Sequence, residues 1–107
     1  MAQFIFFFRE SQLSEDPKTY RDNWENWVKG LKENKHLIAG APLLADGVIV
    51  KNHGELVEDF VFDFKANASD FMIIEAQDIQ AAVGLSKTCP IFSLGGTVTI
   101  RPIIKPY

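Results

Sequence analysis

The sequence predicts an α+β domain of the ferredoxin-like type, in which two helices pack on one face of an antiparallel sheet. The expected elements follow one another as strand, helix, strands, helix and strand, which is the βαββαβ order with a hairpin inserted in the middle. The closing segment, residues 97–101, alternates between apolar and polar side chains after two glycines that let the chain turn sharply. We therefore expect residues 1–107 to form a single domain whose first and last strands are neighbours.

The first predicted strand, residues 2–9, is apolar on both faces. Its alternating side chains are Phe4, Phe6 and Phe8 on one face and Ile5 and Phe7 on the other. A strand of this kind is usually covered on both sides, but two helices can cover only one face of the sheet. Because exposed phenylalanines would promote aggregation, we expect the open faces of two copies to pack together as a symmetric homodimer.

The first helix is predicted to start around residues 14–17. Asp16 is a good N-cap, and Pro17 suits the first helical position, where its missing N–H costs nothing. The helix should end near Asn34, a residue that tolerates the left-handed conformation. One stripe of this helix is apolar: Tyr20, Trp24, Trp27, Val28 and Leu31. The two tryptophans fit the core best, although they could also stack on an aromatic ligand.

The second helix should begin after Asp78, another N-cap residue, and end around Lys87 or Thr88, because a helix does not continue into Pro90. Glycine at position 84 weakens it. Its inward-facing residues are expected to be Ile79, Ala82, Val83 and Ser86.

Between the two helices the pattern predicts four strands. They cover residues 36–39, 48–51, 56–64 and 71–75. Ala41 and Pro42 should break the first of them, and residues 52–54 should form the turn of a hairpin between the second and the third. One face of the longer hairpin strand carries Phe60, Phe62 and Phe64.

The composition excludes several classes of partner. The net charge is −3 and no cluster of Lys and Arg is present, so we expect no nucleic-acid partner. The apolar run at residues 4–8 is too short to span a bilayer and is followed directly by charged residues, so we expect a soluble protein that does not bind membranes. A single cysteine can form no intrachain disulfide, which suits the cytoplasm. Two separated histidines make no metal site, and we expect neither a metal nor another cofactor.

Three side chains could carry chemistry, and each has a plainer alternative. His53, in the hairpin turn, could act as a mobile acid or base, although a solvated turn histidine is commoner. Cys89 could be a nucleophile, although a small buried residue is the usual case. Arg101 needs a carboxylate, for which Glu75 and Glu58 are candidates, or an anionic ligand.

Three segments carry a resemblance to a known family. They are CP at residues 89–90 followed by GGTVTIRP at 95–102, LIAGAPL at 37–43 and FMIIEA at 71–76. In this order and spacing they resemble the YCII-related (YciI-like, DGPF) family over nearly the whole chain. The resemblance implies a ferredoxin-like, dimeric α+β barrel, in agreement with the burial argument.

The resemblance also shows where this chain departs from the family. The namesake DGPF stretch falls on residues 58–61, where only the first acid remains, while Asp63 and Lys65 match the acid and the lysine that often follow it. In the YciI branch a histidine of the first helix is thought to be catalytic, and Asn23 occupies that position here. The aspartate that accompanies it before the proline is replaced by Cys89.

Two functions fit these observations. The first is a small homodimeric protein that binds a small organic ligand between helices and sheet and that, as an enzyme, would be a cofactor-free lyase or isomerase. Its expected residues are Asn23, Lys65 and Arg101 for orienting the ligand and His53 or Glu75 for moving protons. The second is a non-catalytic dimerisation or protein-interaction module. A cavity of roughly 300 Å³ or more, lined by convergent polar groups, would favour the first.

Overall fold

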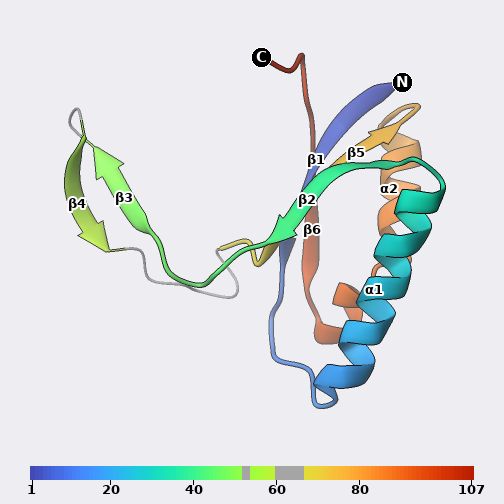
Figure 1. Ribbon diagram of the computed structural model, residues 1–107, viewed down its shortest axis with the longest axis horizontal. Coiled ribbons are helices and arrows are strands. Elements are labelled where there is room, and N and C mark those ends of the chain that lie inside the picture. The colour runs from blue at the N-terminus through green and yellow to red at the C-terminus, as the bar shows by residue number, and fades with distance from the viewer. Residues whose placement is uncertain (52–53, 60–66) are drawn as a thin grey trace.

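The computed structural model describes residues 1–51, 54–59 and 67–107. Figure 1 shows their arrangement. The elements are β1 (Ala2–Arg9), α1 (Pro17–Glu33), β2 (Leu37–Pro42), β3 (Val48–Lys51), β4 (Glu55–Asp59), β5 (Asp70–Ala76), α2 (Ile79–Ser86), the short 3₁₀ helix η1 (Pro90–Leu94) and β6 (Thr97–Pro102). Six residues named in the sequence analysis lie outside the described residues: His53, Phe60, Phe62, Asp63, Phe64 and Lys65.

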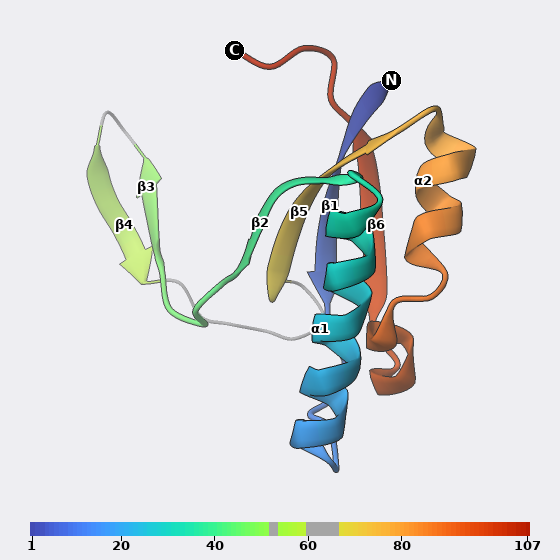
Figure 2. The ribbon, with the colours of Figure 1, turned by 45° about the vertical axis from the view of Figure 1, so that its right-hand side comes forward.

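Four strands form one antiparallel sheet in the order β2-β5-β1-β6. This is the strand order of a ferredoxin-like fold, with β1 in the interior between β5 and β6. Both helices cover the same face of the sheet, as Figures 1 and 2 show. The predicted fold class is confirmed, and so is the pairing of the first strand with the last, in which Phe6 lies opposite Ile100.

The inserted hairpin is a separate two-stranded sheet made of β3 and β4. Its turn contains Gly54 with a φ of 101°, the positive value that the sequence pattern predicts for this glycine. In both views the hairpin extends away from the four-stranded sheet, on the side opposite to α1 and α2.

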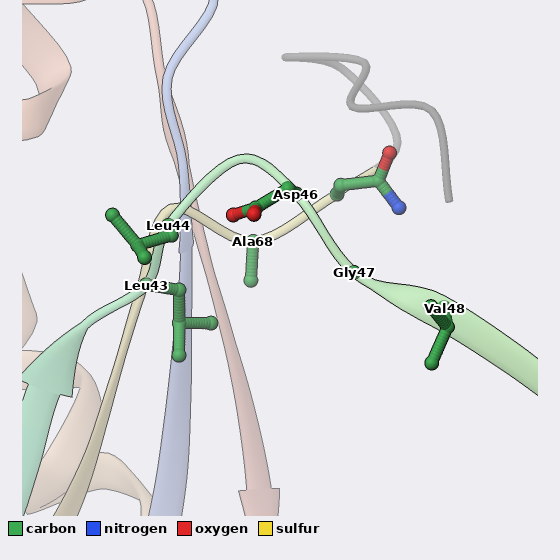
Figure 3. Close-up of a pocket in the computed structure, with 7 residues that line it drawn as sticks. Leu43, Leu44, Asp46, Gly47, Val48 and Ala68 are labelled. Carbon is green, nitrogen blue, oxygen red and sulfur yellow. The ribbon is translucent and has the colours of Figure 1, made fainter. Parts of the chain in front are cut away.

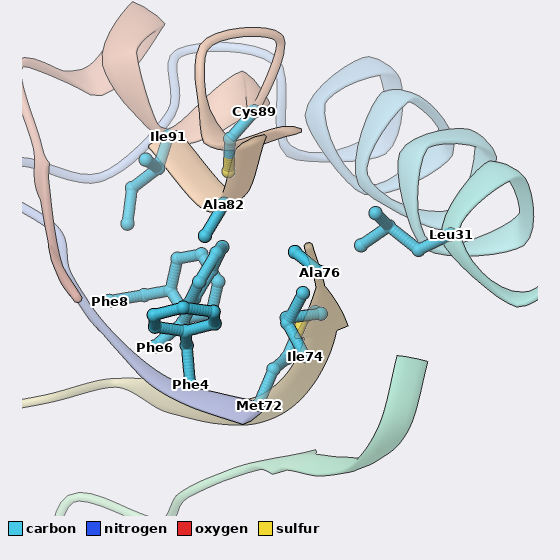
Figure 4. Packing of buried hydrophobic residues seen from close by; sticks show 10 residues of the cluster. All are labelled: Phe4, Phe6, Phe8, Leu31, Met72, Ile74, Ala76, Ala82, Cys89 and Ile91. Carbon is cyan, nitrogen blue, oxygen red and sulfur yellow. The ribbon is translucent and has the colours of Figure 1, made fainter. Parts of the chain in front are cut away.

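The core lies between the four-stranded sheet and the helices (Figure 4). Its buried residues are Phe4, Phe6, Phe8, Met72, Ile74 and Ala76 from the sheet, Leu31 from α1, Ala82 from α2, and Cys89 and Ile91 from the segment around η1. Trp24 and Trp27 of α1 pack against this cluster, and the indole N–H of Trp27 donates to the Thr88 hydroxyl at 3.1 Å. The apolar stripe predicted for the first helix therefore faces the core.

No helix among the described residues lies over the other face of β1. Ile5 and Phe7 point to this face and are half-buried in the single chain, together with Phe71 and Ile73 of β5. We call this side of the sheet the open face.

The end of α1 differs from the prediction by one residue. Asn34 keeps a negative φ and donates to the Gly30 carbonyl oxygen from both its backbone and its side chain, at 3.1 and 2.9 Å. These bonds extend the helical hydrogen bonding to Asn34, so the left-handed turn falls on Lys35, with a φ of 61°.

The strand after α1 is longer than predicted. It runs from Leu37 through Pro42, and Pro42 does not break it. This strand is at the edge of the sheet, so the missing N–H of the proline leaves no gap in the ladder. Pro90 likewise does more than end α2, because it begins η1, which closes at Gly95 with a φ of 67°.

The buried side of α2 also differs from the prediction. Ala82 and Ser86 are buried as expected, but Ile79 and Val83 are each more than a third exposed. Leu85 packs against the core instead. The helix is therefore rotated towards Leu85, which places its small residues nearest to the sheet and leaves two larger ones at the margin.

Candidate functional site: a cleft beside α1

Three adjoining hollows lie between α1 and the end of the sheet where β2 finishes and β5 begins. Their volumes are about 600, 150 and 140 Å³. Trp24 and Asp70 line all three hollows, so we describe them as one site and call it the α1 cleft. The elements that border it can be followed in Figure 2.

Helix α1 forms one wall of the cleft. Tyr20, Trp24 and Val28 follow one another at intervals of four residues, so they share one side of the helix. The start of this helix is fixed by Asp16, whose carboxylate accepts a hydrogen bond from the Thr19 backbone N–H at 3.3 Å. Charged side chains of α1 form the rim: Arg21, Glu25, Lys29 and Lys32.

The sheet contributes a pair of carboxyl groups. Asp70, the first residue of β5, lies opposite Phe8 of β1 in the antiparallel register. Because Phe8 faces the helices, Asp70 does so as well. Glu10 directly follows β1, and the antiparallel pairing brings it to the same end of the sheet. These two carboxyl groups and Tyr20 together line the smallest of the three hollows, that of about 140 Å³.

Burial changes the protonation of both carboxyl groups. It raises the pKa of Asp70, and a hydrogen bond with Ser69 offsets part of this effect. The pKa of Glu10 is raised first by burial and then by the negative charge of Asp70. Each group therefore keeps its proton to a higher pH than an exposed carboxyl, which suits a general acid or base.

The Tyr20 hydroxyl is a buried donor in the same hollow. Its oxygen has no hydrogen-bond partner among the described residues. Burial, followed by the negative charge of Glu10, raises the pKa of Tyr20, so the hydroxyl stays protonated. An unpaired buried polar group costs about 1–3 kcal/mol. A ligand oxygen that accepted this hydrogen bond would remove that cost.

The rim of the cleft carries more cations than anions. Arg21 borders the hollows of about 600 and 140 Å³, and Lys32 borders those of about 600 and 150 Å³. The Lys29 Nζ atom lies 3.9 Å from Glu33 Oε1 in an exposed ion pair, and such pairs restrain a side chain only weakly. A ligand with an anionic group and a flat apolar body could place the anionic group near these cations and the flat part against the indole of Trp24.

The structure places three of the five sequence-predicted site residues, and all three lie apart from this cleft. Asn23 is exposed on α1 and is not among the residues that line it. Glu75 and Arg101 lie on the open face of the sheet, the first half-buried on β5 and the second exposed on β6. Arg101 has no ion-pair partner among the described residues. The other two, His53 and Lys65, lie outside the described residues.

Other reactive groups are less suited to chemistry. Cys89 is buried, and burial raises the pKa of its thiol to about 12, so it stays protonated and is a poor nucleophile. His36 lies with Nδ1 2.9 Å from the Glu75 carbonyl oxygen, at the far end of β5 from Asp70. In residues 1–51, 54–59 and 67–107 no three His, Cys, Asp or Glu side chains come together as a metal site.

Sequence reasoning missed Tyr20, Glu10 and Asp70 as a group. Tyr20 is part of the apolar stripe predicted for the first helix, and neither acid is singled out from the sequence. A signal was present: Glu10 ends one apolar strand and Asp70 begins another. If those strands pair in antiparallel fashion, the two acids must meet at one end of the sheet.

The helix and sheet arrangement defines a ferredoxin-like α+β fold with a cleft beside its first helix. No protein-family profile matches this chain, and no curated protein sequence does. Among solved structures, 5-chloro-2-hydroxyhydroquinone dehydrochlorinase from Burkholderia phenoliruptrix AC1100, in complex with 2,5-dihydroxybenzoquinone, is similar with a TM-score of 0.53. The two chains share 17% sequence identity, and the match covers 92% of this chain and 90% of the other. This likeness confirms the fold. No helix among the described residues has the length and apolar character needed to cross a bilayer.

The substitution Asp70→Asn is expected to stabilise the folded protein at neutral pH. The folded-state pKa of Asp70 is raised above the ordinary value of 3.8, so its ionisation opposes folding. The unfavourable contribution is absent below the unfolded pKa and grows as the pH rises through the folded pKa. Melting temperatures measured from about pH 4 to about pH 8 should show a gain for the variant that is smallest at the acidic end, grows with pH and levels off above the folded pKa.

Asp46→Asn, at an exposed aspartate in the loop between β2 and β3, is the control and should leave this pH dependence unchanged. Glu10 still titrates in the Asp70 variant, so a smaller dependence should remain. Equal melting temperatures for wild type and Asp70→Asn at every pH would contradict the burial of Asp70.

Proposed function

We propose that this protein binds a small organic ligand in the α1 cleft and that it is a relative of the YCII-related proteins. The observation that carries the proposal is the cleft itself: about 600 Å³ in its outer part, bordered by the Trp24 indole and by converging charged groups. This volume exceeds the roughly 300 Å³ at which a cavity favours a ligand site over a filled core. The family relationship rests on the sequence resemblance and on the shared fold.

The ligand that fits best is a flat organic molecule with at least one anionic or strongly polar oxygen. Trp24 would stack on the flat part, and Arg21 would bind the anionic group. The Tyr20 hydroxyl would donate a hydrogen bond to a ligand oxygen, because it has no acceptor among the described residues. The similar solved structure is an enzyme described in complex with a dihydroxybenzoquinone, a ligand of this kind.

The chemistry that suits such a site is proton transfer without a cofactor. Asp70 has the position and the raised pKa of a carboxyl that can deliver or remove a proton. Asn23, Lys65, Arg101, His53 and Glu75 remain predictions for ligand binding and proton transfer, but the contacts in the cleft favour Asp70 and Tyr20 for these roles. We propose a lyase or isomerase reaction on this basis.

We further propose that the protein is a cytoplasmic homodimer formed by one domain of residues 1–107. The half-buried Ile5, Phe7, Phe71 and Ile73 of the open face support the dimer, because a second copy would cover them. One cysteine in the chain supports a reducing compartment.

The ligand proposal is tested by a thermal-shift screen of aromatic and hydroxy acids, followed by affinity measurements on variants. A ligand at 100 times its Kd should add about 2.7 kcal/mol to the stability of the folded state. Tyr20→Phe and Asp70→Asn should each weaken binding of the best compound at least tenfold, the loss of one or two hydrogen bonds.

Two matched controls separate the cleft from the rest of α1. Trp24→Phe should weaken binding, whereas Trp27→Phe should not, because Trp27 borders another hollow. For a ligand bound in the cleft, Asn23→Ala should also leave affinity unchanged, because Asn23 does not line the cleft. A compound whose affinity survives both Tyr20→Phe and Asp70→Asn would place the ligand elsewhere, and no response across the library would favour a non-catalytic role.

A non-catalytic dimerisation or protein-interaction module is the second candidate function. Its supporting observation is the exposed apolar surface of the β3–β4 hairpin, which includes Val48 and Val50. Under this alternative the cleft would bind no small molecule, while substitutions in the hairpin would change association.

A further inference from the structure

The β3–β4 hairpin, of which residues 48–51 and 54–59 are described, projects from the body of the protein, and we call it the arm. It shares no strand pairing with the four-stranded sheet. The radius of gyration is 15.2 Å, against about 13 Å for a compact domain of this length. Figures 1 and 2 both show the arm on the side of the sheet away from the helices, next to the open face.

Apolar side chains lie on the arm and at its base without cover from the described residues. Val48 and Val50 share one side of β3 and are 62% and 59% exposed, and Leu44 before them is 84% exposed. A hollow of about 350 Å³ at the base is bordered by apolar Leu43, Leu44, Val48 and Ala68 and also by Asp46, Gly47 and Asn67. In Figure 3 the side chains of Leu43, Val48 and Ala68 all point in the same direction, downwards in this view.

An arm of this kind needs a surface to pack on. A two-stranded hairpin alone is at best marginally stable in water. Exposed apolar strands with free edges also tend to associate. The described part of the body supplies little of this surface, since neither helix and no strand of the main sheet makes more than slight contact with β3 or β4.

The open face has the composition of an interface centre, but it is too small by itself. Apolar Ile5, Phe7, Phe71 and Ile73 occupy its middle, and polar Glu75 and Arg101 lie towards one end. Four strands about 4.8 Å apart and seven residues long cover roughly 450 Å². A stable dimer usually buries about 800 Å² on each partner.

The missing contact area is supplied if the arm of each protomer packs on the surface of its partner. One side of a two-stranded arm of five residues covers roughly 170 Å². In a two-fold dimer each protomer contributes its own arm and the surface beneath its partner's arm. Together with the open face this brings the interface to about 800 Å² on each protomer.

We propose that the arm of each protomer clasps a second copy of this chain, with the Val48 and Val50 side against the partner's body and the hollow at its base filled by the partner. This inference rests on the homodimer of the proposed function and adds the part of the chain that holds it together. The two copies would meet through their open faces, and each arm would lie along the margin of the other.

Sedimentation equilibrium of the full chain tests the clasp. The triple variant Leu44→Ser, Val48→Ser and Val50→Ser is expected to raise the dimer dissociation constant at least tenfold while its circular dichroism and melting of the body stay unchanged. Leu13→Ser removes an equally exposed leucine from the loop before α1 and should leave the dissociation constant as it is. Hydrogen exchange of the β3 and β4 amides should slow as the wild-type concentration is raised.

A second variant separates the clasp from the dimer itself. Ile73→Lys places a charge in the middle of the open face and should give a folded monomer. A triple arm variant that dimerises like wild type, beside a monomeric Ile73→Lys, would overturn the clasp and leave the dimer in place. A wild-type monomer at every concentration would overturn both, whereas the ligand experiment on the α1 cleft would still stand. Arm amides protected equally at all concentrations would show that the arm packs on its own chain.

Discussion

Replacing Phe8 by alanine is expected to destabilise the protein by about 3–5 kcal/mol, the usual range for deleting a large buried aromatic side chain. Phe8 is fully buried. Its ring centroid lies 5.2 Å from that of Trp24 and 5.9 Å from that of Trp27, both in edge-on geometry. The substitution therefore leaves a cavity and also removes two favourable aromatic contacts. Urea unfolding followed by circular dichroism measures the loss.

Phe92→Ala makes the same chemical change at a position that is 46% exposed, in η1. It should cost less than about 1.5 kcal/mol, since only part of the side chain leaves an apolar environment. Similar losses for the two variants would mean that the core is not centred on β1. Because Phe8 supports the indole of Trp24, ligand binding to Phe8→Ala should be weakened even under conditions where the variant is folded.

The second large effect is expected from Gly96→Ala, which should destabilise the protein by about 3 kcal/mol, the upper part of the range for overpacking. A Cβ at this position would collide with the Arg9 carbonyl oxygen and would lie 2.7 Å from Cγ1 of Ile91. The carbonyl belongs to β1, the strand paired with β6, and cannot move away without disturbing the sheet. Thermal or urea unfolding measures the change.

Gly84→Ala is the matched control and should have the opposite sign. Gly84 lies in α2, and no atom of the described residues outside the helix's own nearby backbone lies within 4 Å of the position its Cβ would take. Alanine has the higher helix propensity, so a gain of about 0.5–1 kcal/mol is expected. Equal losses at both positions would show that the contact with β1 is not what requires glycine at position 96.

Under the proposed function, Asp70 of the α1 cleft would affect both stability and ligand binding. Burial raises the pKa of this carboxyl, which costs folding free energy at neutral pH. The same burial gives the group the protonation behaviour that acid–base chemistry uses. A variant such as Asp70→Asn, expected to be more stable and to bind ligand more weakly, would show that the protein gives up stability for this site.

The strands and helices were predictable where local chemistry alone decides them. The alternation around Phe6 predicted β1, and the capping residues Asp16 and Asp78 predicted where the helices begin. Boundaries that depend on neighbours were less accurate. Pro42 remains in β2 only because that strand is at the sheet edge, a property that no local pattern contains.

The candidate site could not be assembled from the sequence for the same reason. Tyr20, Glu10 and Asp70 come from three separate parts of the chain, and their pKa shifts arise from burial that exists only after α1 has packed on the sheet. Asn23 was selected by its position in a family pattern, and Arg101 by its charge in an apolar strand. The structure places both outside the cleft.

The sequence by itself determined the order of the elements, the apolar sides of β1 and α1, and the need to cover two faces of one strand. These follow from side-chain periodicity, which is a local property. The tertiary structure alone decided which residues meet beside α1, how far the arm stands from the body, and which glycine has no room for a side chain. Those depend on strand register and helix rotation, where a change of one residue exchanges a buried side chain for an exposed one.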